Sequence, residues 1–132
     1  MRFLLDTNIV SDLVRNPQGQ VVERITRVGE ANIATSIVVA AELRYGAAKR
    51  ASSSLSAQLA AVLGVLEIIP ESPTDEVYGR LRASLERAGT LIGPNDLLIA
   101  AQALALGLTL VTDNHREFSR VDRLPLQNWL RD

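Results

Sequence analysis

The chain has 132 residues, 47% of them hydrophobic and 22% charged, which is typical of a globular protein with a buried core rather than a disordered one. It has no cysteine and one histidine, which excludes disulfide scaffolds, thiolate metal sites and catalysis by a pair of histidines within one chain. A net charge of −1 gives no overall attraction to nucleic acid, although a local basic patch remains compatible with it.

The first half of the chain alternates short apolar runs with helical patterns. Asn8 is expected to cap the first helix and Gly29 to end the second. In chain order the predicted elements are a strand at 2–5, helices at 9–15 and 20–28, a strand at 31–35, a helix at 36–50, a loop at 52–58 leading into a helix near 55–63, and a strand at 65–70.

The second half continues the alternation. A helix at 72–89 is well signalled, with Ser72 as its N-cap, Pro73 at its first position, Asp75 three residues after the cap and Gly89 at its end. The remaining predicted elements are a nearly all-apolar helix at 93–107, a strand at 108–112, a loop with a short helix, and a closing strand around 124–129.

This alternation predicts one α/β domain, 1–132, with a parallel sheet and helices on both of its faces. In such sheets ligands bind outside the carboxyl ends of the strands. Asp6 and Asp113 each follow an apolar strand directly, so both are expected to face one crevice. No apolar run approaches the roughly 20 residues of a membrane helix, and no secretory signal is evident. We therefore expect a cytoplasmic protein without a membrane segment.

Two further acids have apolar neighbours. Glu42 lies in a helix stripe that contains Val38, Val39, Tyr45 and Gly46, where an unpartnered carboxylate is costly unless the position lies at an edge and reaches water. Asp96 begins the apolar helix at 93–107, and taken alone it is the kind of residue that caps a helix.

Together these four acids predict a metal site. Clustered carboxylates raise each other's pKa values, and a divalent cation removes that conflict. Oxygen ligands suit Mg²⁺ or Mn²⁺. The polar residues beside the strand-end acids would orient the carboxylates or a bound water, although turn and cap chemistry explains them equally well; they are Thr7, Asn8, Thr112 and Asn114.

The segments "LLDTNIVSDL", "ATSIVVAAELRYGA", "GTLIGPNDLLIAAQALALGLTLVTDNHREF" and "LPLQNW" resemble the PIN-domain nucleases and, within them, the VapC-type toxins. The resemblance covers essentially the whole chain and is weakest between Ser52 and Ser72. It implies a three-layer α/β/α fold with a central, mainly parallel sheet of four to five short strands. It also implies an Mg²⁺- or Mn²⁺-dependent endoribonuclease, a homodimer, and a VapB-type antitoxin that joins it in a larger complex.

Carried over by motif, Asp6 and Asp96 are the main metal ligands. Glu42 is the third acid, acting through a metal or a water, and Asp113 is a variable fourth. RNA contacts are expected from arginines around the crevice: Arg116 first, then Arg15, Arg44 and Arg50, any of which could instead be surface charge or part of the antitoxin interface.

Two alternatives remain open. An α/β phosphatase with an aspartyl nucleophile would use Asp6, but such enzymes usually carry a second acid two residues later, where this chain has Asn8. A non-catalytic regulatory module with a receiver-like fold would bind metal without cleaving RNA. The sequence does not identify the RNA cleaved, or the number of metal ions.

Overall fold

The structure, a computed structural model, describes residues 2–70 and 74–131. Its strands are β1 (Phe3–Leu5), β2 (Ile33–Ser36), β3 (Glu67–Ile69), β4 (Thr109–Val111) and β5 (Leu126–Gln127). Its helices are α1 (Thr7–Arg15), α2 (Gln20–Val28), α3 (Ile37–Arg50), α4 (Ser53–Val65), α5 (Asp75–Ala88), α6 (Pro94–Leu106) and α7 (His115–Phe118), with a 3₁₀ turn at Glu30–Asn32.

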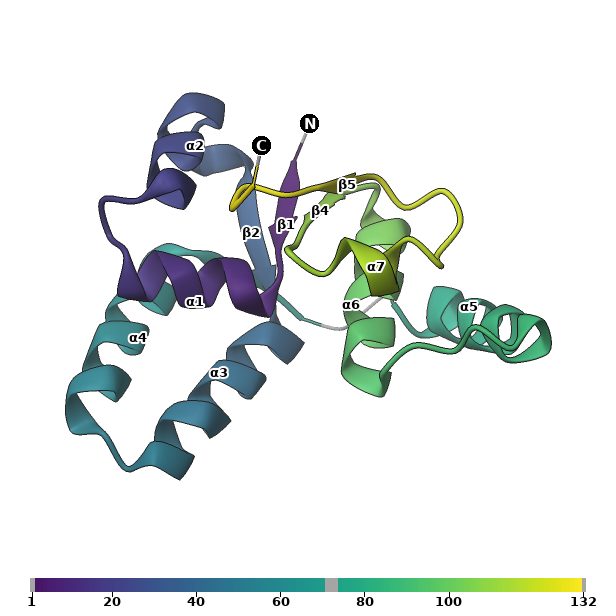
Figure 1. Cartoon of the computed structure of the whole chain (residues 1–132), viewed down its shortest axis with the longest axis horizontal. Helices are drawn as coiled ribbons and strands as arrows, with labels where there is room; N and C mark the ends of the chain where they lie inside the picture. Colours follow the sequence, from purple (N-terminus) through teal and green to yellow (C-terminus); the bar gives the residue numbers. More distant parts are fainter. Residues whose placement is uncertain (1, 71–73, 132) are drawn as a thin grey trace.

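The strands form one sheet in the order β3-β2-β1-β4-β5, and all neighbouring strands are parallel. The chain builds outwards from β1 to β3, then crosses to β4 and builds the other way. Right-handed crossovers therefore place α1–α4 on one face and α5–α7 on the other. Figure 1 shows α1, α3 and α4 on one side of the strands and α5 and α6 on the other. This confirms the predicted three-layer α/β/α fold.

The strand order reverses between β1 and β4, and such a switch point opens a crevice at the carboxyl ends of the strands. Leu5 is in register with Val111, so the next residues, Asp6 and Thr112, lie side by side. The backbone N–H of Asp6 donates to the carbonyl of Val111 at 2.9 Å. The fold thus brings the two strand-end motifs together, as predicted.

The buried apolar residues include all of β1 and the middle of α6, a helix whose nearly all-apolar pattern predicted burial; in α6 they are Leu97, Ile99, Ala100, Ala101 and Ala103. Trp129 near the end of the chain is 2% exposed, and its ring packs on Phe3 with 5.2 Å between centroids. This contact anchors the C-terminal segment across the sheet beside β1. Within the described residues, none of the helices combines the length and apolarity needed to span a bilayer.

Two local predictions are wrong, and a third concerns residues outside the described part of the chain. Asn8 is not the cap of the first helix: α1 begins at Thr7, and Asp6 with extended backbone stands at the N-cap. The loop predicted at 52–58 is wrong, because the Ser52 side chain accepts the N–H of Leu55 and α4 begins at Ser53. The cap and first position predicted at 72 and 73 lie outside the described residues, and the described helix begins at Asp75.

Candidate active site

Asp6 is a buried carboxylate at the centre of the crevice, 4% exposed. Its Oδ2 accepts a hydrogen bond from the Thr112 hydroxyl at 2.8 Å. Its Oδ1 is buried and has no hydrogen-bond partner among the described residues. Burial raises the pKa of Asp6, the charge of Glu42 adds to that rise, and the Thr112 hydrogen bond opposes it. An orphaned buried carboxylate oxygen is costly, so Oδ1 is a candidate ligand for a cation.

Glu42 approaches Asp6 from α3. The helix begins at the Ser36 cap, whose hydroxyl accepts the N–H of Val38 at 3.0 Å. Glu42 is half-buried, and its Oε1 accepts from the Thr7 hydroxyl at 3.2 Å. The apolar stripe around it is buried at Val38 but not at Tyr45, which is 66% exposed. Glu42 therefore stands where buried and exposed parts of α3 meet.

Asp96 lies in the first turn of α6, three residues after the N-cap Gly93. It is therefore not the cap residue itself. The pKa of Asp96 is raised to about 7. Burial is the largest cause, the charges of Asp6, Glu117 and Glu42 follow it, and a hydrogen bond to Glu117 adds to the rise. Because three other carboxylates act on Asp96, these acids form one electrostatic cluster, which we call the acid cluster: Asp6, Glu42, Asp96 and Glu117.

Glu117, on the single-turn helix α7, is the member that sequence reasoning missed. Its Oε1 accepts the backbone N–H of Gly93 at 2.9 Å, and its Oε2 accepts the Asn114 amide at 3.0 Å. These two hydrogen bonds lower the pKa of Glu117, and the bond from Gly93 has the larger effect. The only signal in the sequence was an acid in the short "HREF" stretch after the strand-end motif, which looks like ordinary loop charge.

Asp113 has partners of a different kind. Its Oδ1 accepts hydrogen bonds from Asn128 and from the guanidinium of Arg131, both at 2.8 Å. These two hydrogen bonds lower the pKa of Asp113, and the bond from Arg131 has the larger effect. The partners of Asp113 therefore lie in the C-terminal segment, whereas the partner of Asp96 is Glu117. Of the four predicted acids, Asp6, Glu42 and Asp96 belong to the acid cluster and Asp113 borders it.

The four polar residues beside the strand-end acids each make a contact at this site. Thr7 bonds Glu42, and Thr112 bonds Asp6, as described above. Asn114 holds Glu117, and its own N–H donates to the Thr112 hydroxyl at 2.9 Å. Asn8 accepts the backbone N–H of Asp113 at 3.2 Å. These contacts orient the carboxylates or the loop that carries them.

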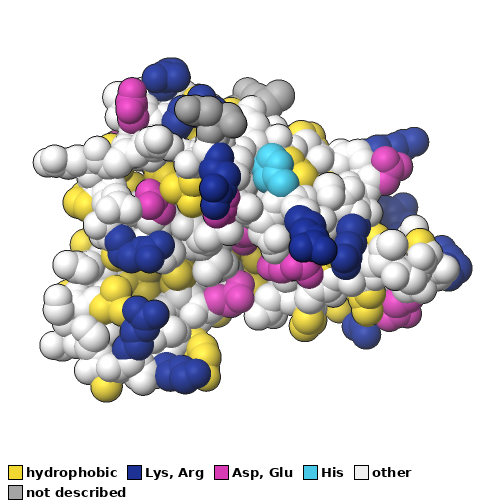
Figure 2. Space-filling model, viewed as in Figure 1, with side chains coloured by type: hydrophobic (Ala, Val, Ile, Leu, Met, Phe, Trp, Pro, Cys, Tyr) yellow, Lys and Arg dark blue, Asp and Glu magenta, His cyan; other side chains and the backbone are white. Residues whose placement is uncertain are grey.

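The predicted arginines lie on different surfaces. Arg116 is exposed and lines a cleft of about 880 Å³ that also includes Asp113. Arg15 and Arg50 line a smaller groove of about 170 Å³, which Glu42 also borders. Arg44 is exposed on α3. Figure 2 shows acidic side chains gathered in the middle of one face, with Lys and Arg side chains around them.

The acid cluster fits a hard divalent cation in its donor chemistry. All its candidate ligand atoms are carboxylate oxygens, and no hydrogen-bond donor among the described residues reaches Asp6 Oδ1. Within residues 2–70 and 74–131, no three His, Asp or Glu side chains already stand as a complete ligand set. This is compatible with Mg²⁺, which usually keeps several waters and takes only one or two protein carboxylates together with substrate phosphates.

Thr112→Val should destabilise the protein by about 1–3 kcal/mol near pH 7, because it strands the Asn114 N–H and removes the donor to Asp6. Thr112→Ser, which keeps the hydroxyl, is the matched control and should lose much less. Urea denaturation of both variants in chelator measures the difference. Equal stabilities of the Val and Ser variants would show that the hydroxyl contributes nothing.

Comparison with known proteins adds to this geometry. The PIN domain family matches residues 3–124. The chain is 40% identical to the ribonuclease VapC2 of Rickettsia felis, over 98% of each chain. The chain belongs to the PIN-domain family, among the VapC ribonucleases.

Two solved structures of VapC family members place its fold in context. One is a chain of the Rickettsia felis VapBC2 structure, which is bound to a DNA fragment from the promoter. It matches this chain with a TM-score of 0.88 and 39% identity, over 98% of this chain and 99% of that chain. The other is a chain of DNA-bound VapBC from Salmonella typhimurium, which matches this chain with a TM-score of 0.86 and 33% identity over 98% of both chains. A further VapC relative, from Shigella flexneri, is named a tRNA(fMet)-specific endonuclease and is 36% identical over 98% of each chain.

Proposed function

We propose that this VapC-family chain is an Mg²⁺- or Mn²⁺-dependent endoribonuclease whose centre is the acid cluster. The observation that carries the proposal is the environment of Asp96. Burial and the charges of three nearby carboxylates raise its pKa to about 7. Such crowding is unfavourable without a cation. The naming of VapC relatives as ribonucleases supports hydrolysis of RNA as the reaction.

Asp6 and Asp96 would hold the cation, with Glu42 and Glu117 as further oxygen donors, directly or through water. A bound divalent cation neutralises charge on the scissile phosphate and lowers the pKa of water beside it. Glu42 or Glu117 would orient the attacking water and accept its proton. Thr7, Thr112 and Asn114 would hold these carboxylates in place.

The part proposed for Asp113 follows from its partners. Arg131 and Asn128 occupy its Oδ1, so we assign it to positioning the C-terminal segment rather than to holding the cation. Water, not a ribose 2′-hydroxyl, is the nucleophile in this scheme. The products should therefore carry a 5′-phosphate and a 3′-hydroxyl.

A VapB-type antitoxin is the proposed protein partner, because this chain resembles solved VapBC structures, one of which is named as a member of the VapBC family of toxin–antitoxin systems. The groove between α1, α3 and α4 suits it: Val14, Leu43, Leu55 and Leu59 give an apolar lining, and Arg15 and Arg50 give charge. A ligand there would also meet Glu42, which would couple binding to the acid cluster.

A homodimer within a larger toxin–antitoxin complex is also proposed. Ile37 and Tyr45 are exposed apolar side chains on α3, 41% and 66% exposed. They line a shallow hollow of about 610 Å³ with Leu98 of α6. An exposed apolar surface of this kind is typical of an interface between chains. We place the assembly in the cytoplasm, where its RNA substrate and antitoxin would be found.

The phosphatase alternative has less support. Asn8 stands two residues after Asp6, where such an enzyme needs an acid, and its side-chain oxygen is engaged by the Asp113 N–H. A receiver-like module has no need of Glu42 and Glu117 beside Asp96. Membership of the VapC ribonucleases favours the nuclease over both.

The purified chain, free of partner protein, should cleave RNA in Mg²⁺ or Mn²⁺ and not in EDTA. Total RNA and purified initiator tRNA are the substrates to incubate, the second because one relative is named for it. Sequencing of the new ends should find 5′-phosphates. Cleavage that persists undiminished in EDTA, or ends that carry 2′,3′-cyclic phosphates, would overturn the proposed chemistry.

A further inference from the structure

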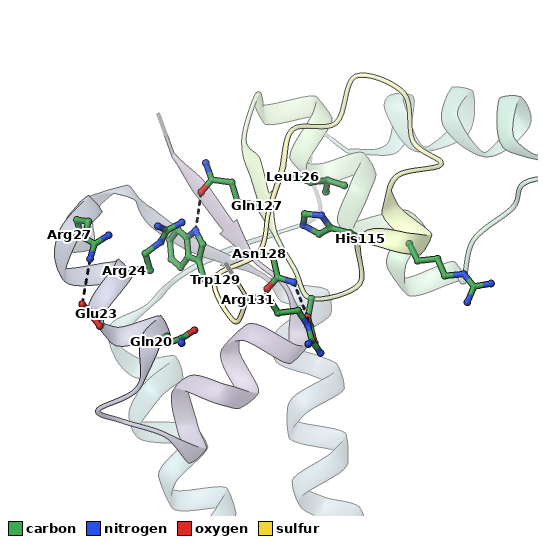
Figure 3. Close-up of a pocket in the computed structure, with 12 residues that line it drawn as sticks. Gln20, Glu23, Arg24, Arg27, His115, Leu126, Gln127, Asn128, Trp129 and Arg131 are labelled. Carbon is green, nitrogen blue, oxygen red and sulfur yellow. Dashed lines mark hydrogen bonds and ion pairs between the residues drawn. The ribbon is translucent and has the colours of Figure 1, made fainter.

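A cleft of about 880 Å³ opens between α2 and the C-terminal segment. Figure 3 shows its α2 wall, with Arg24, Arg27 and Gln20, facing the segment from Leu126 to Arg131, with His115 farther along. The antitoxin groove described above lies elsewhere, between α1, α3 and α4. We call the cleft in Figure 3 the arginine cleft, after the arginines among its lining residues.

The cleft is basic although the chain is not. Four of its lining residues are arginines, Arg24, Arg27, Arg116 and Arg131, and its acids are Glu23 and Asp113. Glu23 pairs with Arg27 at 3.4 Å, and Asp113 pairs with Arg131 at 2.8 Å. Within residues 2–70 and 74–131, Arg24 and Arg116 form no ion pair, so the cleft has two uncompensated positive charges. A local excess of this size attracts polyanions even when the net charge of the chain is −1.

One of these arginines is held firmly in place. The Arg24 guanidinium lies over the ring of Trp129, 5.8 Å from its centroid. Trp129 is itself fixed by its packing on Phe3 and by the hydrogen bond from its indole N–H to Gln127 at 2.9 Å. A guanidinium ordered in advance loses less entropy when it binds a phosphate. Arg27, with 63% of its side chain exposed, and Arg116 remain open to solvent.

Two residues that line the cleft, Asp113 and Arg116, are direct sequence neighbours of residues at the acid cluster. Arg116 and Glu117 are neighbours in α7, yet Arg116 lines the cleft while Glu117 bonds Gly93 and Asp96. Asp113 lines the cleft too, and its N–H is held by Asn8 in the helix that follows Asp6. A chain of phosphates with one phosphate at the acid cluster would therefore run on into the cleft.

We propose that the arginine cleft binds the ribose-phosphate backbone of the RNA next to the scissile phosphate, with Arg24, Arg27, Arg116 and Arg131 as phosphate contacts. The inference rests on the proposed function, whose reacting phosphate fixes the direction of the strand. Guanidinium groups fork onto phosphate oxygens, and the amides of Gln20 and Asn128 in the same cleft suit ribose hydroxyls or base edges. An acidic protein segment would match the charge but would gain nothing from adjacency to the acid cluster.

The test measures RNA binding without cleavage, in EDTA, by fluorescence anisotropy of a short labelled single-stranded RNA. The variant is Arg27→Gln with Arg116→Gln, because both side chains are exposed and neither change should unfold the protein. Arg80→Gln with Arg87→Gln, two exposed positions on α5, is the charge-matched control. Arg24→Gln is a second variant, read together with its melting temperature because it also loses the Trp129 contact.

The cleft variant should bind RNA about tenfold more weakly at low salt, and the slope of log Kd against log salt should fall by about 1.4, or 0.7 for each lost phosphate contact. The α5 control should bind as wild type does. Unchanged affinity and slope in the cleft variant would overturn the inference. It would also be overturned if the cleft variant bound RNA as wild type does but bound a labelled oligoglutamate peptide more weakly in the same assay. Failure of the proposed function shows separately, as absence of metal-dependent cleavage by wild type.

Discussion

Asp6→Asn is expected to lower the rate of RNA cleavage by about a thousandfold or more, because the amide cannot supply the charge that the proposed site needs. The carboxylate is 4% exposed, and its Oδ1 has no partner among the described residues. Asn has the same shape, and its oxygen can still accept the Thr112 hydroxyl. The variant should therefore fold, which circular dichroism and a melting curve would verify.

Asp122→Asn is the matched control for this change. Asp122 is an acid with 96% of its side chain exposed, paired loosely with Arg123 at 3.9 Å. It should cleave RNA as wild type does in the same Mg²⁺ or Mn²⁺ assay. A folded Asp6→Asn protein that keeps a substantial part of the wild-type rate would show that the buried acid has no part in the reaction.

The second large effect concerns stability. Asp96→Asn should raise the melting temperature of the metal-free protein by several degrees near pH 7, corresponding to about 1–3 kcal/mol of unfolding free energy. The change removes a carboxylate whose pKa is raised to about 7 by burial and by the charges of Asp6, Glu117 and Glu42. The loss of an acid from the first turn of α6 costs about 0.3–1 kcal/mol through the helix dipole, which is smaller.

The sign of the pH dependence follows from the raised pKa. The folded protein prefers Asp96 protonated, so this group's contribution to stability is complete below the ordinary pKa of 3.8 and is lost as the pH rises towards about 7. Asp6, whose pKa is also raised, acts in the same sense. Asp113 and Glu117, whose pKa values are lowered, act oppositely and in more acidic solution.

The difference in unfolding free energy between wild type and Asp96→Asn, measured by urea denaturation in chelator, should therefore widen from pH 4 to pH 7. Measuring the difference cancels the contributions of the other acids to first order. A difference that stays constant over this range, or a variant less stable than wild type at pH 7, would mean that Asp96 is not under strain in the folded protein.

Much of the fold could be predicted from the sequence because its signals are local. The signals for the short apolar strands at 2–5 and 108–112 and for the helix ends at Gly29 and Gly89 each act within a few residues. The serine run after residue 51 misled the prediction, because serines suit both loops and helix N-caps, and here Ser52 is a cap.

The site was predictable in part, and what was missed depends on tertiary structure. Asp6 and Asp96 stood out because acids follow or begin apolar segments. Glu117 became visible only when α7 carried it to the Gly93 N–H, 24 residues away in sequence. Asp113 was grouped with the acids from its strand-end position, yet Arg131 and Asn128 of the C-terminal segment reach it first.

Binding of Mn²⁺ to the metal-free protein, followed by electron paramagnetic resonance, tests most directly whether the acid cluster is a cation site. Wild type and Asp122→Asn should take up Mn²⁺ with the same affinity, and Asp6→Asn and Asp96→Asn should each bind it at least tenfold more weakly. Equal uptake by all four proteins, or none by wild type, would contradict a cation shared by these carboxylates.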